Sequence, residues 1–360
     1  MVWEKNDYWG EPMAVYAFWN NKGGVGKSYL TFQVACEYAR THADKKILVI
    51  DLCPQANASG MLLGGMINGE RLLSELSPSR TISTYIEDRI VSPYVNPNTG
   101  AQYLTQISQY NSAIPVNLFL IAGDETLEIQ ASRVYGATQP GPADAWRIVH
   151  SWISDLINDV KNSWDQADVT VFIDCNPSFS IYTELAMSAA QRVLVPFSAD
   201  GSSKRAVRAV LALLFGITRQ AGTQQSEFFN NSLRFTMALP QIYCYIGNRL
   251  TQYVKSASAF GQVVREIGEE IWNVWLHNSN RFCVHPVSAG VPQSRRAFTN
   301  MFQFEIVDAN TASVVSSTLG IPIMSLNAGL ISVNGKSVNV NQSQLDKQRP
   351  NIRDLVAIIE

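Results

Sequence analysis

A glycine-rich run near the start of the chain has the composition of a phosphate-binding loop. It reads Asn-Asn-Lys-Gly-Gly-Val-Gly-Lys-Ser over residues 20–28, between an apolar stretch at 13–19 and a helical pattern. Glycines let the backbone turn tightly and point N–H groups inward, and the following helix N-terminus adds partial positive charge. In such a loop the ammonium of Lys27 reaches the terminal phosphates of a nucleotide, and the hydroxyl of Ser28 binds Mg²⁺.

Two aspartates each follow a short apolar run. Residues 46–50 lead to Asp51, and residues 169–173 lead to Asp174. A carboxylate at a strand end beside a phosphate loop supplies the charge that Mg²⁺ and its waters require. Alone, each aspartate would more often be a turn former or a helix cap. Three motifs in this order favour a magnesium site instead.

The phosphate loop departs from the ordinary pattern in two ways. Asn21 stands where a glycine is usual, and a second lysine, Lys22, lies inside the loop. This form resembles the deviant Walker A motif of the family that includes the ParA partition ATPases, MinD and the nitrogenase iron protein. The segment from Asp51 to Ser59 is similar to the ParA switch segment. Asp174 resembles the family's Walker B aspartate, with Asn176 in place of a proline.

The resemblance covers about residues 13–60 and 115–250, and it implies roles for matching residues. It implies nucleotide binding by Lys22, Gly23, Gly24, Val25, Gly26, Lys27, Ser28, Tyr29 and, at the adenine, Asn248. It implies that Mg²⁺ is held by Ser28, Asp174 and, partly through water, Asp51. The implied catalytic residues are Lys22, Asp51 and Cys53, with Lys22 reaching the partner's ATP across a dimer.

Cys53 is the main departure within the switch segment. The ParA-like pattern has a carboxylate there, which orients or deprotonates the attacking water. A thiol has an ordinary pKa of about 8.5, and nearby phosphate charge raises it, so Cys53 is a neutral, weak acceptor. We therefore expect slow ATP hydrolysis and a long-lived ATP-bound dimer. The alternative is that Cys53 is simply buried and a residue outside the motif does the chemistry.

Composition is typical of a globular protein without a strong charge bias. Of 360 residues, 46% are hydrophobic and 16% are charged, with a net charge of −2. Residues 1–12 lack signal-peptide features, and the five cysteines are scattered without metal-type spacing, which favours the cytoplasm, with nucleoid association if DNA is bound. Short apolar strands alternating with helices predict an α/β fold. The alternation predicts a doubly wound, mostly parallel sheet with helices on both faces, and the resemblance implies that residues 1–360 form a single P-loop ATPase domain. The expected helices include 28–40, 143–162 and 203–218.

Two segments interrupt this alternation. Residues 60–114 read as an insertion of small helices and a loop, with one helical candidate at 83–90; it is either a mobile surface segment or a partner-binding or dimer element. Residues 301–360 read as a C-terminal extension packed on the core. Within it, Asn334 and Gly335 predict a β-hairpin over 330–340, followed by an amphipathic helix at 351–359.

The resemblance implies a ParA-like ATPase that dimerises with ATP and Mg²⁺, binds DNA non-specifically, and is released by an adaptor or activator protein. Its work would be to position a plasmid, a chromosome or a protein assembly. An alternative is a nearly inactive ATP-binding assembly or signalling module. A MinD-like membrane regulator is less favoured because such a membrane-binding helix needs basic residues beside its apolar face. Arg353 is the only basic residue within the expected helix 351–359. Candidate DNA contacts are Lys204, Arg205, Arg208, Arg295 and Arg296, although a solvated helix face and a loop pair is the favoured interpretation of these residues.

Overall fold

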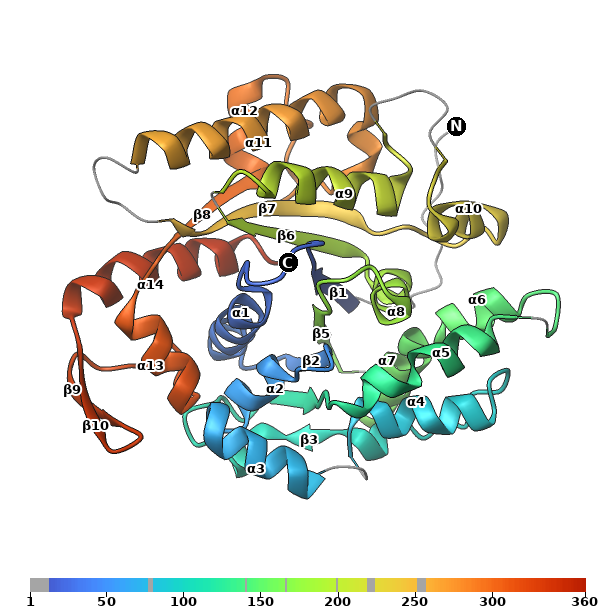
Figure 1. Ribbon diagram of the computed structural model, residues 1–360, viewed down its shortest axis with the longest axis horizontal. Coiled ribbons are helices and arrows are strands. Elements are labelled where there is room, and N and C mark those ends of the chain that lie inside the picture. The colour runs from blue at the N-terminus through green and yellow to red at the C-terminus, as the bar shows by residue number, and fades with distance from the viewer. Residues whose placement is uncertain are drawn as a thin grey trace.

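Eight strands form one twisted sheet in the order β3-β4-β2-β5-β1-β6-β7-β8 (Figure 1). The computed structural model describes residues 13–76, 80–139, 141–165, 167–198, 200–218, 224–250 and 257–360, without the side chains of 249–250 and 257–260, so the N-terminal segment 1–12 lies outside it. The pairings are parallel except for β3 against β4. The strands are β1 (Met13–Phe18), β2 (Lys46–Leu52), β3 (Thr105–Gln106), β4 (Leu118–Ile121), β5 (Val169–Cys175), β6 (Arg192–Ser198), β7 (Gln241–Leu250) and β8 (Gln303–Val307).

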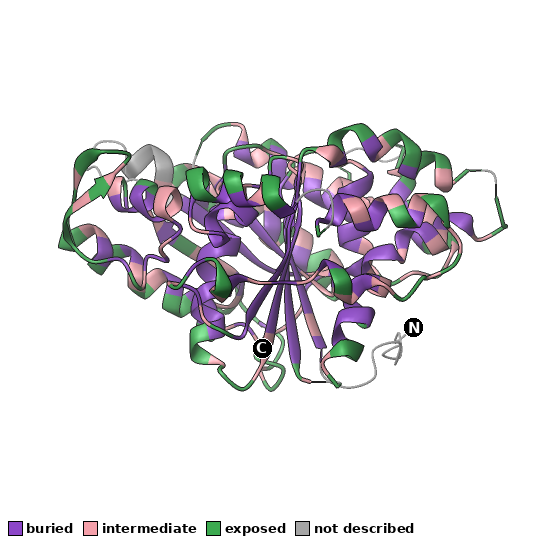
Figure 2. Ribbon diagram, turned by 90° about the horizontal axis from the view of Figure 1, so that it is seen from below, coloured by how far each residue is buried: buried purple, intermediate pink, exposed green. Residues whose placement is uncertain are grey.

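Helices cover both faces of the sheet, as the strand and helix alternation predicts. Because side chains alternate along a strand, Val15 and Ala17 enter one core while Tyr16 and Phe18 enter the other. Figure 2 shows the strands buried between these two helical layers. One layer comprises α4 (Ile82–Val91), α5 (Thr126–Ala137), α6 (Ala145–His150), α7 (Trp152–Ser163), α8 (Ile181–Ala189), α9 (Ser203–Phe215), α10 (Glu227–Arg234), α11 (Ala257–Asn278) and α12 (Arg295–Phe302). The other comprises α1 (Lys27–Thr41), α2 (Asn57–Leu62), α3 (Met66–Leu76), α13 (Thr311–Leu319) and α14 (Gln342–Ala357).

Two helix predictions were wrong in their bounds. The single helix expected over 143–162 is instead α6 and α7, separated at Ser151, whose hydroxyl donates to the carbonyl oxygen of Arg147 at 2.9 Å. Serine hydroxyls compete in this way with regular helical hydrogen bonds. The final helix begins at Gln342 rather than 351, and Pro350 lies inside it.

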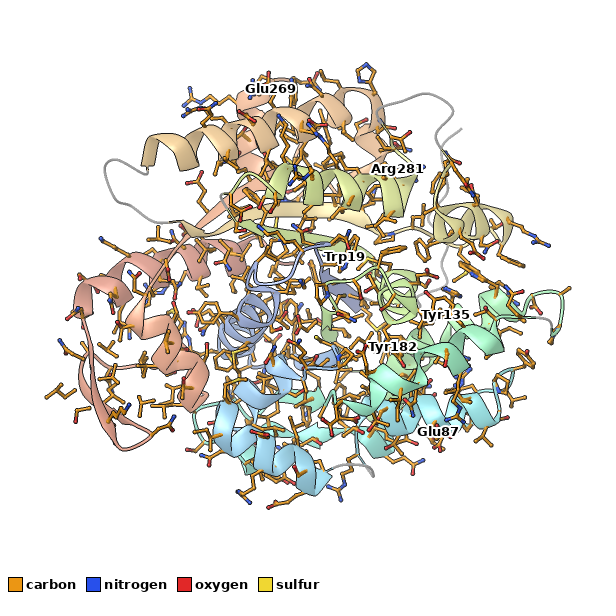
Figure 3. The ribbon with its side chains drawn as sticks, viewed as in Figure 1. Trp19, Glu87, Tyr135, Tyr182, Glu269 and Arg281 are labelled. Carbon is orange, nitrogen blue, oxygen red and sulfur yellow. The ribbon has the colours of Figure 1, made fainter. Side chains whose placement is uncertain are left out.

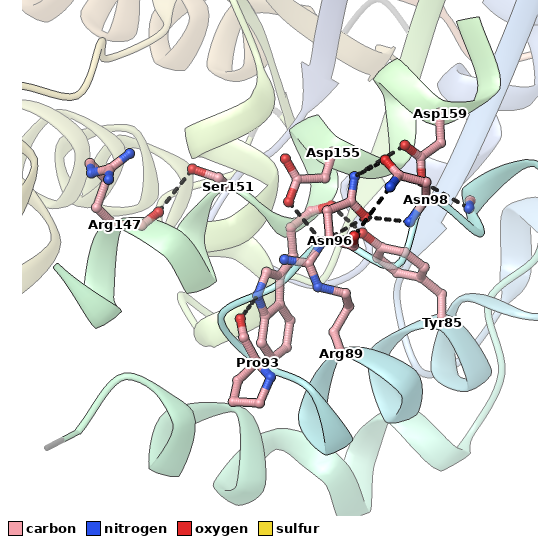
Figure 4. A network of polar contacts seen from close by, with 11 residues as sticks. Tyr85, Arg89, Pro93, Asn96, Asn98, Arg147, Ser151, Asp155 and Asp159 are labelled. Carbon is pink, nitrogen blue, oxygen red and sulfur yellow. Dashed lines mark hydrogen bonds and ion pairs between the residues drawn. The ribbon is translucent and has the colours of Figure 1, made fainter. Parts of the chain in front are cut away.

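The insertion is anchored to the body of the protein by a buried polar network (Figure 4). The Arg89 side chain of α4 is 1% exposed; its guanidinium donates to Asp155 of α7 at 2.7 Å and lies over the Trp152 ring. Asn96 donates to Asp159, also of α7, at 3.1 Å. The helix predicted at 83–90 is confirmed as α4. The segment also holds α3, β3 and two short 3₁₀ helices, η1 (Gly100–Tyr103) and η2 (Ile107–Gln109).

The C-terminal extension contributes an edge strand and a separate hairpin. β8 pairs with β7 at the sheet edge, which the sequence analysis did not anticipate. The predicted hairpin is confirmed as β9 (Gly329–Val333) and β10 (Lys336–Val340), joined by Asn334 and Gly335, both with positive φ. The extension meets the insertion closely: a Cβ added to Gly65 would lie 2.0 Å from the Thr318 carbonyl oxygen. Glycine is required there, because both backbones need the space.

Candidate nucleotide-binding site

The phosphate loop connects β1 to α1 and leaves α1 with its first turn facing a cavity. Gly24 and Gly26 adopt positive φ values of 75° and 84°, and Gly26 caps the helix. A Cβ added to Gly26 would lie 2.1 Å from the amide nitrogen of Asn248, so only glycine fits. Figure 3 shows Trp19, the residue before the loop, in the middle of the molecule. The loop is thus held on a buried strand rather than on a surface turn.

Asn248, at the end of β7, supports the loop from behind. Its side chain is 1% exposed, and its amide donates to the Val25 carbonyl oxygen at 2.9 Å. This supporting role was missed by sequence reasoning, which assigned Asn248 to adenine. The adenine contact stays a prediction, and it would require part of this buried amide to become accessible. The closely spaced glycines of the loop were the sequence signal for this contact, because glycines allow another group to pack closely against the backbone.

Lys27 points into its own loop. The residue is 6% exposed, and its ammonium donates to the carbonyl oxygens of Lys22 at 2.9 Å and Asn20 at 3.3 Å. Burial lowers the pKa of Lys27, while the charge of Asp174 raises it. The buried ammonium interacts mainly with neutral carbonyl groups. Anionic phosphate oxygens would bind it more strongly than these carbonyl oxygens do, because they carry a full charge.

Asp174 is the carboxylate best placed for a cation. It is register partner to Asp51 across β5 and β2 and is fully buried. Burial and the charge of Asp51 raise its pKa, whereas a Ser28 hydrogen bond and the charge of Lys27 lower it. Among the described residues, nothing hydrogen-bonds its Oδ2 atom. An unpartnered buried carboxylate oxygen beside Ser28 is the oxygen donor set that Mg²⁺ takes, so these residues fit the ion.

Asp51 has a different role, because both of its oxygens are already engaged. Its Oδ2 accepts from the Ser59 backbone N–H at 2.9 Å and hydroxyl at 2.8 Å, and its Oδ1 accepts from the Cys53 N–H at 3.1 Å. The Ser59 hydroxyl oxygen in turn accepts from the Gly123 N–H at 3.0 Å. Asp51 therefore orders the switch segment. Its predicted share in Mg²⁺ binding would have to be indirect, through water.

Cys53 lies in the cavity wall and carries no charge at neutral pH. It is 5% exposed, and burial together with Asp51 and Asp174 raises its pKa to about 12. The direction agrees with the expectation from sequence, although its causes here are burial and carboxylates rather than phosphate. A thiol with this pKa is a poor proton acceptor at pH 7.

Lys27, Ser28 and Cys53 line a cavity of about 460 Å³, which falls within the usual range for small-molecule sites. Residues from five parts of the chain meet there: the loop, the switch segment, the end of β5, the insertion and the extension. Met66 and Ser317 come from the last two, and nothing in the motifs indicated them. The remaining lining residues are Gly23, Gly24, Gly26, Lys27, Ser28, Tyr29, Cys53, Gln55, Asn57, Met61, Cys175 and Pro177.

Lys22 does not line this cavity, and Tyr29, which does, also makes a contact outside it. The Lys22 ammonium contacts Ser198 at 3.0 Å and forms an ion pair with Asp200, in the turn between β6 and α9. The Tyr29 hydroxyl donates to Gln348 of α14 at 2.6 Å, which ties α1 to the C-terminal extension. The structure therefore brings Lys27, Ser28, Asp174, Asp51 and Cys53 together and leaves the side chain of Lys22 outside.

The candidate DNA contacts do not form one basic surface. Lys204 and Arg208 of α9 pair with Glu266 at 3.1 Å and Glu270 at 2.9 Å, both on α11. Arg205 is exposed on α9, whereas Arg295 and Arg296 are exposed at the start of α12. α11 packs against both α9 and α12, so the two groups are separated. In the described part of the chain, no helix is both long and apolar enough to cross a bilayer.

Comparison with known proteins gives a family and several distant relatives. A family model described as an AAA domain matches residues 13–226. The chain is 24% identical over 259 residues to a Rhizobium rhizogenes protein provisionally named replication protein A, covering 71% of this chain and 57% of that protein. It is 22% identical over 192 residues to the chromosome partitioning protein ParA of Myxococcus xanthus, covering 53% of this chain and 54% of that protein. The chain thus spans little more than half the length of these two relatives.

Among solved structures, an ATP complex of a McdA variant from Cyanothece superposes with a TM-score of 0.59. The alignment covers 98% of this chain and 99% of that chain at 14% identity. At this identity the likeness concerns the fold, and it agrees with the sheet order and helical layers described above.

The burial of Asp174 predicts a pH-dependent cost in the nucleotide-free protein. Because its folded-state pKa is raised, the folded protein holds this proton more tightly than the unfolded chain, and stability falls as pH rises through the raised value. Asp174→Asn removes the cost, so in urea unfolding without Mg²⁺ it should stabilise the protein more at about pH 8 than at about pH 5. The same gain at both pH values would contradict the assignment.

Proposed function

This chain belongs to the AAA domain family and is a ParA/MinD-type P-loop ATPase in fold, and we propose that it is an ATP-dependent dimerising switch that positions or segregates a cargo. The observation that carries the proposal is the division of labour between two lysines. Lys27 lines the cavity and lies close enough to Asp174 for their charges to interact, while Lys22 leaves the same loop in another direction. A lysine that leaves the loop away from its own cavity supports the proposal that it serves the nucleotide of a second subunit.

Binding would rearrange few groups in the site. Bound ATP would bring negatively charged phosphates into the site, and bound Mg²⁺ would offset part of that charge during phosphoryl transfer. The loop N–H groups and the start of α1 would receive the phosphates, and Lys27 would exchange its carbonyl partners for phosphate oxygens. Ser28 and the unpartnered oxygen of Asp174 would hold the ion. Asp51 would keep the switch segment in place through Ser59.

Hydrolysis by this site is proposed to be slow. The switch segment presents a neutral thiol at Cys53, where burial and two carboxylates suppress ionisation. A well-placed general base typically contributes about 10²–10⁴ in rate. A site without one favours a persistent ATP-bound state, which suits a switch that waits for an activating partner.

The proposed cargo is a plasmid, a chromosome or a protein assembly, in line with a relative named as a chromosome partitioning protein. Plain duplex DNA and an adaptor or activator protein are the proposed partners. Arg205, Arg295 and Arg296 make no ion pair in the described part of the chain, so they are better candidates for phosphate contacts than Lys204 and Arg208. DNA binding through them would weaken with salt.

A nearly inactive ATP-binding assembly module is the second candidate, and Cys53 is the observation that favours it. The packing of α14 argues against the membrane alternative. Its apolar residues Leu345, Ile352, Leu355 and Val356 are buried in the core beside α1, so this face is not available to a lipid surface.

The role proposed for Lys22 predicts a dimer whose hydrolysis depends on that lysine. Wild-type protein should dimerise with a non-hydrolysable ATP analogue and Mg²⁺ in light scattering. Lys22→Gln should keep ATP affinity and lose most of its ATPase activity. In comparable enzymes, a positive side chain from a partner that stabilises the negative charge of the transition state increases the hydrolysis rate about 10³–10⁵-fold. Lys45→Gln, which removes a surface lysine paired with Asp168, is the control. A wild-type protein that stays monomeric at all concentrations would count against the proposal.

The thiol at Cys53 predicts a gain of activity on substitution. Cys53→Asp restores a carboxylate, and steady-state ATPase activity should rise about tenfold or more. Cys53→Ser keeps a small neutral side chain and should stay slow. Brisk wild-type turnover that Cys53→Asp leaves alone or lowers would show that the missing carboxylate does not limit the rate.

A further inference from the structure

The lysine that the proposed function sends to a partner subunit is already occupied within its own chain. The Lys22 ammonium lies 3.0 Å from the Ser198 hydroxyl and 3.5 Å from the Ser203 hydroxyl, and it forms an ion pair with Asp200. All three residues belong to the end of β6 and the start of α9, on the opposite side of β1 from β5. In this position, the ammonium cannot also contact the phosphates of a second subunit.

Asp200 is itself held in position to receive the lysine. Its carboxylate accepts from the Ser198 hydroxyl at 2.6 Å, and from the Ser202 N–H at 3.0 Å and hydroxyl at 2.7 Å. Partial burial raises its pKa, but hydrogen bonds from Lys22, Ser198 and Ser202 outweigh this and hold the pKa well below its ordinary value. The carboxylate is therefore charged at neutral pH, and its orientation does not depend on Lys22 alone.

The contact is of the right strength for a reversible latch. The Lys22 and Asp200 side chains are 24% and 47% exposed, so water screens the pair. Exposed ion pairs are weak, with a typical effect of about one- to fivefold on an equilibrium. A phosphate group carries more charge than a carboxylate and would be less exposed in a closed interface, so it can displace Asp200 once ATP is bound.

We propose that Asp200 is a positioning residue that keeps Lys22 turned toward α9 in the nucleotide-free subunit and must release it before the ATP-bound dimer can form. This inference rests on the dimeric switch proposed above and adds its resting state. Asp200 competes with the partner's phosphates for the same ammonium, so it sets the threshold for dimerisation. It is not among the residues that line the candidate nucleotide cavity of its own subunit.

Two readouts on Asp200→Asn test the latch, and only one requires a dimer. In nucleotide-free monomer, acetylation of Lys22 by acetic anhydride, followed by peptide mass spectrometry, should be about two- to fivefold faster than in wild type, because the amine is no longer held against Asp200 and is more accessible to the reagent. With a non-hydrolysable ATP analogue and Mg²⁺, the dimer dissociation constant should fall by about the same factor. The asparagine keeps an acceptor oxygen for Ser202, so the turn is retained.

Two further variants complete the design. Asp200→Glu keeps the charge and should behave as wild type in both measurements. Asp168→Asn breaks the matched surface pair with Lys45, whose side chains are 21% and 40% exposed, and should change neither measurement. Unchanged Lys22 acetylation, or an unchanged dimer constant despite faster acetylation, would overturn the latch. A wild-type protein that stays monomeric with the ATP analogue would overturn both the proposed dimer and the role of Asp200 in gating it. In that case, faster acetylation of Lys22 in Asp200→Asn would still show that the contact between Lys22 and Asp200 exists in solution.

Discussion

The structure depends on the burial of one lysine and two aspartates at a single point where strands end. Lys27, Asp51 and Asp174 are 6%, 0% and 0% exposed, and burial opposes the charged form of each. Isolated charges at this depth would be very costly, so each must be balanced by a neighbour or neutralised. The protein balances Asp51 with N–H groups and Lys27 with carbonyl oxygens, and it leaves one oxygen of Asp174 open. That open oxygen is the donor that is available to a bound cation.

The surrounding elements transmit this constraint outward. Ser59 links Asp51 to Gly123, and next to it Asp124 accepts a hydrogen bond from Ser83 of the insertion helix α4. On the other face, Gln33 of α1 contacts Ser316 at 2.8 Å and the Ile323 N–H at 2.8 Å, both in the C-terminal extension. The insertion, which lies within the residues 13–226 that match the family, is therefore joined to the switch segment, and the extension, which lies beyond them, is joined to the helix that begins at the phosphate loop. Short chains of hydrogen bonds therefore connect the candidate nucleotide site with the insertion and with the extension.

Sequence reasoning could predict the parts that follow from local pattern. The phosphate loop, the two aspartates at strand ends, the parallel sheet and the Asn334-Gly335 hairpin all have short-range signals, and the structure has each of them. The reasoning could not predict contacts made by tertiary packing. Asn248 behind the loop, Met66 and Ser317 in the cavity wall, and β8 at the sheet edge carry no local signature, because their roles arise from segments distant in the chain. The break at Ser151 was missed because the apolar spacing continues across it.

The central claim is that a buried lysine and an open carboxylate form one site for Mg²⁺ and ATP, and calorimetric titration of a non-hydrolysable ATP analogue tests it most directly. With Mg²⁺, wild type should bind with a clear heat, and at 100 times the dissociation constant the analogue should stabilise the fold by about 2.7 kcal/mol. Lys27→Ala should lose most of this affinity, whereas Lys45→Ala should keep it. Equal binding and equal thermal shifts in wild type and Lys27→Ala would contradict the account.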